Sequence, residues 1–125
     1  MLTRLLKAKL HHARVTRCDP EYHGSITIDT ELLKASGLLP NEKVLVADCE
    51  NGNRFETYVI PGEAGSGTIG INGAAALLTR PGNRVIVMSF VDALPHELDR
   101  HVARVLILGP SNEIVELIRT PTRLP

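Results

Sequence analysis

The Asn51-Gly52 pair is the local feature that most constrains how this chain can fold. It lies between segments 44–48 and 54–60, which are rich in the branched and aromatic residues that favour β-strands. An Asn-Gly pair between two such segments is typical of a β-hairpin with a tight primed turn. The middle of the chain is therefore predicted to be an antiparallel hairpin.

Further short strands are predicted on both sides of this hairpin. Apolar and basic residues alternate early in segment 3–16, but the alternation changes phase near His11 and His12, which indicates a β-bulge. Ile26 and Ile28 alternate with polar neighbours and indicate another strand. Three more strands are predicted at 84–91, 102–108 and 113–118.

Two short helices separate these strands. Asp29 is placed to cap a helix that runs to Ala35 and ends at Gly37, and Asn72 is placed to cap a second helix at 73–78. Many short strands with two short helices favour a mainly β fold, a small β-barrel, over an open α/β sheet. The chain is expected to form a single domain, residues 1–125, with a loop at 62–67 and a loose tail at 119–125.

The composition excludes several classes of protein. No apolar run approaches the ~20 residues of a membrane-spanning helix, so no membrane association is expected. The formal net charge is zero, which argues against a nucleic-acid partner. Cys18 and Cys49 show no CxxC spacing, so we expect a reducing, cytoplasmic setting. The acid-free stretch before Asp19 alternates with the period of a strand, unlike a helical transit peptide.

Two motifs that suggest metal or phosphate binding do not fit their templates. His96 and His101 are five residues apart, whereas the zinc-protease motif needs two histidines four apart on one helix face. The loop at 62–67 lacks the Gly-Lys-Ser/Thr ending of a phosphate-binding loop. No metal site is predicted. The same loop contains Gly65-Ser66, a second Gly-Ser pair beside the one at Gly24-Ser25.

Four short motifs are each modest signals alone. They are Lys9-x-His11, Tyr22-x-Gly24-Ser25, Asn51-Gly52-x-Arg54-Phe55-x-Thr57-Tyr58 and Asn72-Gly73-Ala74-Ala75-Ala76. Together, from Met1 to about Val91, they resemble the pyruvoyl-dependent aspartate 1-decarboxylases. The resemblance implies a double-psi β-barrel, a homotetramer with active sites between subunits, and a proenzyme that cleaves itself.

The resemblance further implies that the bond between Gly24 and Ser25 breaks, leaving a β chain, 1–24, and an α chain, 25–125. Ser25 becomes a pyruvoyl group, the covalent cofactor, which forms a Schiff base with L-aspartate. The products are CO₂ and β-alanine, and the β-alanine supplies pantothenate and coenzyme A biosynthesis. Glycine suits the scissile position because it has no Cβ to obstruct attack by the Ser25 hydroxyl.

By the same resemblance, Tyr58 is the proton donor and Thr57 hydrogen-bonds the Gly24 carbonyl. Simple strand alternation points Thr57 away from Arg54 and Tyr58, so either the strand is irregular or Thr57 faces another subunit's site. The remaining residues are expected to bind substrate: Arg54 and Lys9 as cations for a carboxylate, with His11, Tyr22, Asn72 and the backbone N–H groups of Gly73, Ala74 and Ala75.

Three alternatives stay open at this point. The chain could be a non-catalytic small β-barrel that binds nucleic acid through its cationic first strand, although two tyrosines and two phenylalanines offer few stacking platforms. It could also be a pyruvoyl-dependent decarboxylase that acts on glutamate, because Arg54 and Lys9 do not exclude that substrate. Processing could be spontaneous or could need an accessory maturation protein.

Overall fold

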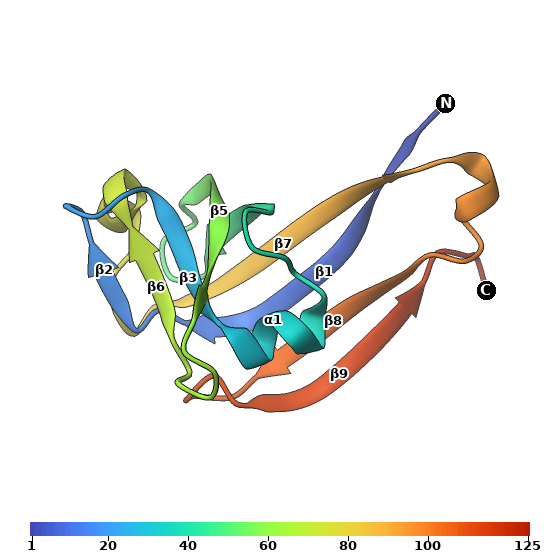
Figure 1. Cartoon of the computed structure of the whole chain (residues 1–125). Helices are drawn as coiled ribbons and strands as arrows, with labels where there is room; N and C mark the ends of the chain where they lie inside the picture. Colours follow the sequence, from blue (N-terminus) through green and yellow to red (C-terminus); the bar gives the residue numbers. More distant parts are fainter.

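The computed structural model describes all 125 residues, and nine strands form one mixed sheet in the order β2-β6-β3-β5-β4-β7-β1-β8-β9 (Figure 1). The strands are β1 (Thr3–Arg14), β2 (Arg17–Asp19), β3 (Ser25–Asp29), β4 (Lys43–Asp48), β5 (Arg54–Gly62), β6 (Ile69–Asn72), β7 (Arg84–Ala93), β8 (Val102–Leu108) and β9 (Ile114–Pro121). The helices are α1 (Thr30–Ser36) and two short 3-10 helices, η1 (Gly73–Leu78) and η2 (Pro95–Glu97).

The sheet closes on itself where β1 passes into β2. Arg14 is paired with Arg84 of β7, and three residues later Arg17 is paired with Gly70 of β6. Between them, the Thr16 backbone N–H donates to the Ile69 carbonyl over 2.8 Å. This passage joins one end of the strand order to the middle of the sheet, which confirms the predicted mainly β barrel.

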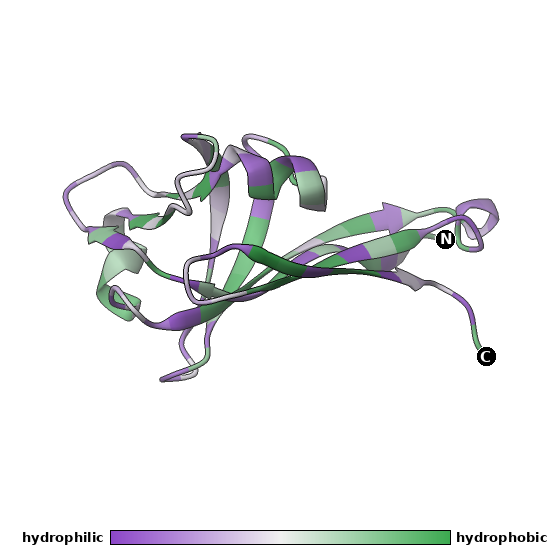
Figure 2. Ribbon diagram, turned by 90° about the horizontal axis from the view of Figure 1, so that it is seen from below, coloured by the Kyte–Doolittle hydropathy of each residue, from purple (hydrophilic) through white to green (hydrophobic).

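A core of 19 buried apolar residues fills the barrel. Its largest members come from the inward faces of several strands, Ile26 and Ile28 on β3 and Ile69 and Ile71 on β6 among them. The first half of β1, the end of β7, the start of β8 and the end of β9 extend from the barrel as an elongated arm near both chain ends (Figures 1 and 2). The barrel, rather than the arm, holds the Gly24–Ser25 bond.

The predicted β-bulge in the first strand is confirmed. The register of β1 against β7 shifts between Leu10 and Ala13, and His12 has a φ of 61°. Leu10 and Ala13 both remain fully buried, because the bulge restores the inward phase of the strand. The helix predicted after Asp29 is also confirmed, since the Asp29 side chain accepts from the Glu31 N–H over 2.8 Å.

The prediction of a tight primed turn at Asn51-Gly52 is wrong, although the predicted hairpin is present. Ala47 pairs with Arg54, and the loop between β4 and β5 spans residues 49–53. A primed two-residue turn needs a positive φ at Asn51, and only Gly52 has one, at 77°. The carboxylate of Asp48 accepts from the N–H groups of Glu50 and Asn51, which stabilises this wider loop.

Two other expectations are corrected by the structure, and two short strands were missed. Asn72 does not cap η1 with its side chain, which points toward β3 instead. The tail predicted at 119–125 begins too early, since β9 continues to Pro121 and pairs there with Val102. The short strands β2 and β6 were not predicted, because three and four residues are too few to show a period.

Candidate active site

The Gly24–Ser25 bond lies where a polar turn enters β3. The turn is held by Asp19, whose carbonyl accepts from the Tyr22 N–H over 3.3 Å and whose carboxylate accepts from the Glu21 N–H over 3.1 Å. Tyr22 is exposed, whereas Ser25 is completely buried. The exposed turn therefore leads directly into a serine whose side chain is excluded from water.

Gly73 packs directly against this bond. Its φ is 76°, and a Cβ added to it would lie 2.7 Å from the Gly24 Cα and 2.9 Å from the Gly24 nitrogen. Only glycine adopts this φ freely and leaves room for such a close approach of two backbones. The first turn of η1, with the N–H groups of Gly73, Ala74 and Ala75, is thereby fixed next to the Gly24–Ser25 bond.

Asn72 supplies a hydrogen-bond donor to the Ser25 hydroxyl. Asn72 is paired with Ser25 across β6 and β3, and its Nδ2 donates to Ser25 Oγ over 2.8 Å. The same nitrogen donates to Thr27 Oγ1 over 3.1 Å. Ser25 Oγ also lies 3.5 Å from the carbonyl oxygen of His23. The hydroxyl of Ser25 is thus held between an amide donor and a carbonyl acceptor.

Tyr58 lies on the same sheet face as Ser25. Strands β3 and β5 are parallel, with Ile26 paired with Val59, so one residue earlier Ser25 is beside Tyr58. Residues paired across neighbouring strands point to the same face, so Tyr58, Ser25 and Asn72 form a row across β5, β3 and β6. Tyr58 is 39% exposed, so part of its side chain is accessible to solvent beside buried Ser25.

Thr57 lies on the opposite face from this row. The pairing of β4 with β5 runs from Lys43–Tyr58 to Ala47–Arg54 without a register shift. The strand is therefore regular, and half-buried Thr57 alternates with its exposed neighbours Glu56 and Tyr58. This excludes the irregular strand that was one of the two explanations for the orientation of Thr57.

Lys9, His11 and Arg54 are not brought to Ser25 within one chain. Strand β1, which carries Lys9 and His11, is four positions from β3 in the sheet. Arg54 is exposed at the start of β5, on the same face as Tyr58. No hydrogen bond or ion pair joins any of these three side chains to Ser25.

His11 has an unusual environment of its own. Its ring stacks on His12 with a centroid separation of 3.9 Å, and its Nδ1 is buried without a hydrogen-bond partner. Burial lowers the pKa of His11, and the nearby charges of His12 and Lys9 lower it further. His11 therefore favours the neutral form more strongly than a free histidine does.

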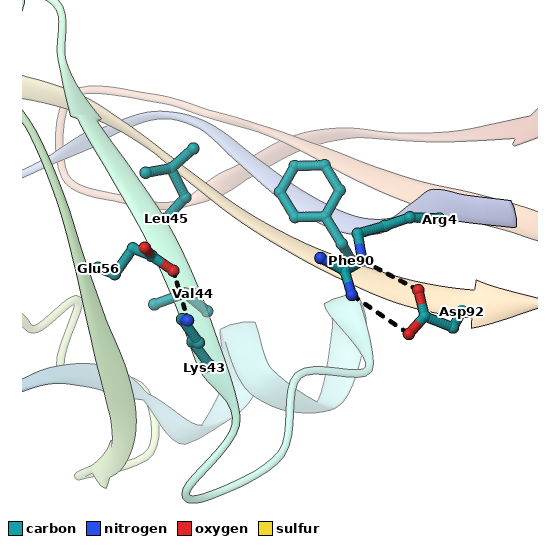
Figure 3. Close-up of a pocket in the computed structure, with 7 residues that line it drawn as sticks. All are labelled: Arg4, Lys43, Val44, Leu45, Glu56, Phe90 and Asp92. Atoms are coloured by element: carbon teal, nitrogen blue, oxygen red, sulfur yellow. Dashed lines mark hydrogen bonds and ion pairs between the residues drawn. The ribbon is translucent and has the colours of Figure 1, made fainter. Parts of the chain in front are cut away.

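The largest surface cavity is separate from these residues. It has a volume of about 460 Å³ and lies on the outward face, between β4, β5, β7 and the first residues of β1 (Figure 3). Two ion pairs line it, Arg4–Asp92 at 2.9 Å and Lys43–Glu56 at 2.7 Å. None of the predicted site residues line it, so Ser25 does not lie in the largest cavity of the single chain.

The hairpin tip braces the end of η1. Asn51 Nδ2 and Asn53 Nδ2 both donate to the Leu78 carbonyl, over 3.1 and 2.9 Å. The buried carboxylate of Asp48 accepts from Thr79 Oγ1 over 2.6 Å and from Asn83 Nδ2 over 2.9 Å. Burial opposes ionisation, but these hydrogen bonds and two from the loop backbone hold the pKa of Asp48 below its usual value. Sequence reasoning missed this bracing, because its partners are about 30 residues apart.

Thr27 is the other residue that sequence reasoning missed. The alternation of Ser25, Ile26, Thr27 and Ile28 already placed its hydroxyl on the face of Ser25. What the pattern could not indicate was the third partner, Asn72, which contacts both hydroxyls from another strand.

The fold and site define a class of protein: a small β-barrel in which a buried serine follows an exposed glycine, flanked by an amide donor, a tyrosine and a helix start. Comparison with known sequences gives the family. A family model described as aspartate decarboxylase matches residues 1–115. The chain therefore belongs to the aspartate decarboxylase family, and the resemblance inferred from its motifs is confirmed.

Several curated relatives carry the name Aspartate 1-decarboxylase. The protein of Caldicellulosiruptor saccharolyticus is 50% identical, over 94% of this chain and 91% of its own length. That of Desulfotalea psychrophila is 47% identical, over 95% of this chain and 100% of its own. That of Salinibacter ruber is 51% identical, over 90% and 77%. In this structure, no helix has the length and apolar character to cross a membrane.

Proposed function

We propose that this chain is an aspartate 1-decarboxylase that converts L-aspartate to β-alanine and CO₂ after cleaving itself between Gly24 and Ser25. The observation that carries the proposal is the row of Tyr58, buried Ser25 and Asn72 next to Gly24, in a chain of the aspartate decarboxylase family. The proposed role in the cell is the supply of β-alanine for pantothenate and coenzyme A, in the cytoplasm.

Self-cleavage would begin at the buried hydroxyl of Ser25. Its Oγ attacks the Gly24 carbonyl carbon, the C–N bond breaks, and the acyl group moves from nitrogen to oxygen as an ester. Loss of the Ser25 Cα proton then breaks the Cβ–Oγ bond, which releases Gly24 as a carboxylate and leaves dehydroalanine at the start of 25–125. Water replaces the nitrogen, ammonia departs, and a pyruvoyl group remains.

The surroundings of Ser25 fit such a group. Ser25 is completely buried, and the Asn72 amide donates to its oxygen. A terminal pyruvoyl group supplies an electron-withdrawing carbonyl, which α-decarboxylation of an amino acid requires. The chain's own residues then have separate tasks. Tyr58 returns a proton to the substrate Cα, and the N–H groups of η1 bind a carboxylate.

Arg54 and Lys9 would bind the substrate carboxylate that is retained, with His11 and Tyr22 nearby. Both cations lack an acidic partner within 4.0 Å in the single chain, so their charge is free for an anion. Lys9 lies on β1, four positions from β3 in the sheet, which supports a site completed by a second subunit. The proposed assembly is a homotetramer. Thr57 faces away from Tyr58. Its proposed hydrogen bond to the Gly24 carbonyl is therefore made to the Gly24 of another subunit.

Intact mass spectrometry tests the cleavage. The purified chain is expected to appear as fragments 1–24 and 25–125, the second beginning with a ketone, and Ser25→Ala is expected to stay whole and inactive. An active preparation that is continuous through Ser25 would refute the proposal. If cleavage appears only in cell extract and not in purified precursor, an accessory maturation protein is required.

Carbon dioxide release from aspartate and from glutamate, measured side by side, tests the substrate. Release from aspartate is expected to dominate. Faster release from glutamate would leave the proposed self-cleavage unaffected but would make glutamate, and not aspartate, the substrate.

A further inference from the structure

Thr27 shares the amide of Asn72 with Ser25. All three side chains are buried, with exposed fractions of 8% for Thr27, 1% for Asn72 and 0% for Ser25. Asn72 Nδ2 carries two hydrogens, and it lies 2.8 Å from Ser25 Oγ and 3.1 Å from Thr27 Oγ1. Each hydrogen therefore has its own hydroxyl acceptor, and the two acceptors are neighbours on one face of β3.

We infer that Thr27 is a positioning residue for self-cleavage, because it keeps the Asn72 N–H directed at Ser25 Oγ. This inference rests on the proposed cleavage between Gly24 and Ser25. Without the Thr27 hydroxyl, the second N–H of a buried amide has no acceptor. Rotation of the amide by 180° then becomes competitive, and it would turn the carbonyl oxygen of Asn72 toward Ser25.

The orientation of the amide matters for the charge on Ser25 Oγ. The oxygen gains negative charge when its proton is removed for the attack on Gly24, and again when the Cβ–Oγ bond breaks and Gly24 leaves as a carboxylate. An N–H donor held at this oxygen stabilises both charges, whereas a carbonyl oxygen in its place would repel them. Thr27 touches no reacting atom, so it acts only through Asn72.

The position of Thr27 allows its hydroxyl to be removed without loss of packing. Thr27 lies opposite Gly70 on β6, which has no side chain to replace the lost acceptor. Its methyl group lies 3.0 Å from where a Cβ of Gly62 would be. Thr27→Val keeps that methyl and nearly the same volume, and Thr27→Ser keeps the hydroxyl. Ser89→Ala is the matched control, because Ser89 Oγ is buried without any hydrogen-bond partner.

The test is a time course of precursor cleavage in the full chain, followed by intact mass. Thr27→Val is expected to slow cleavage about tenfold, less than the ~10²–10³-fold effect of losing a donor at a reacting oxygen. Thr27→Ser and Ser89→Ala are expected to cleave at the natural rate. In an Asn72→Ala background, Thr27→Val is expected to add no further slowing, because its route through Asn72 is gone.

Stability is measured in a Ser25→Ala background, where no variant can cleave. When Thr27→Val is added to the Ser25→Ala chain, the chain is expected to stay folded with one cooperative transition and to lose no more stability than one unsatisfied buried N–H costs, about 1–3 kcal/mol, which separates positioning from a general loss of structure. If Thr27→Val does not fold, Thr27→Ala is the second hydroxyl-free variant. Cleavage of the hydroxyl-free variant at the natural rate, or equal slowing by Thr27→Val with and without Asn72, overturns the role of Thr27 alone. If the unsubstituted protein never cleaves, the proposed function is overturned as well.

Discussion

Gly73 and Gly24 contact each other through their backbones, with no room for a side chain at Gly73. A Cβ there would lie 2.7 Å from the Gly24 Cα. The helix start that bears the proposed carboxylate-binding N–H groups is thus held against the proposed scissile bond, and any shift of one moves the other.

Gly73→Ala is expected to lower the stability of the precursor and to slow its cleavage. The φ of 76° costs alanine about 1–2 kcal/mol, and the clash with Gly24 must also be relieved by a backbone shift. Gly65→Ala is the control, since Gly65 has a φ of 79° but nothing within 4 Å of an added Cβ. The melting temperature and the cleavage rate should both fall further for Gly73→Ala than for Gly65→Ala. Equal effects would mean that the contact between the two glycines is unimportant.

The second Gly-Ser bond, Gly65–Ser66, is expected to remain intact. Ser66 is exposed, and its Oγ lies 2.6 Å from the Glu63 carbonyl and 2.8 Å from Thr68 Oγ1. No side-chain amide donates to it, and water competes for its hydroxyl. Mass spectra should contain no fragment that ends at residue 65, and Ser66→Ala should leave cleavage at Gly24–Ser25 unchanged. A fragment starting at Ser66 would show that a Gly-Ser turn alone is sufficient.

The strand alternation was the most reliable guide that the sequence offered. It placed Thr57 and Tyr58 on opposite faces of β5, and the unbroken register of β4 and β5 agrees. It also located the bulge at His11 and His12, because the phase of buried residues has to be restored there. Both features follow from local rules, in which side chains of one strand alternate between two faces.

The failures came from side chains that act across the fold. Asparagine commonly caps helices, but the side-chain amide of Asn72 donates to Ser25 on β3 and makes no hydrogen bond to the η1 backbone. The Asn51-Gly52 signal located the hairpin but not its turn, because Asp48 binds the loop backbone and also reaches Thr79. Such choices depend on residues distant in sequence, which no local pattern contains.

Tyr58→Phe is expected to separate cleavage from turnover. Tyr58 shares a face with Ser25 and is partly exposed, so its hydroxyl is placed to meet a bound substrate, while Asn72 already serves the Ser25 hydroxyl. Cleavage by Tyr58→Phe should stay near the natural rate, and carbon dioxide release per cleaved chain should fall by about 10²–10⁴-fold, the usual contribution of a general acid. Equal loss of cleavage and turnover would argue against the proton-donor role.

The acid stability of the barrel is expected to depend on Asp48 and Glu50. Hydrogen bonds from Arg84 lower the pKa of Glu50 to about 2, and the pKa of Asp48 is also lowered. Because both carboxyls bind protons less readily when folded, their stabilisation is complete above about pH 4.5 and is lost as the pH falls toward about 2. The denaturation midpoint in urea should therefore decrease over this interval, and buried Asp48 should contribute most of the decrease, because solvent screens the exposed Glu50–Arg84 pair.

Asp48→Asn should flatten that decrease and lower stability at neutral pH. The amide keeps one acceptor but adds a donor beside Thr79 and Asn83, so part of a buried network loses its partners at a cost of about 1–3 kcal/mol. Asp92→Asn is the control, because Asp92 pairs with Arg4 on the exposed arm and has the same direction of pKa shift. The exposed pair should contribute little to either measurement. An equal loss of neutral-pH stability in both variants would mean that the Asp48 network does not brace the barrel.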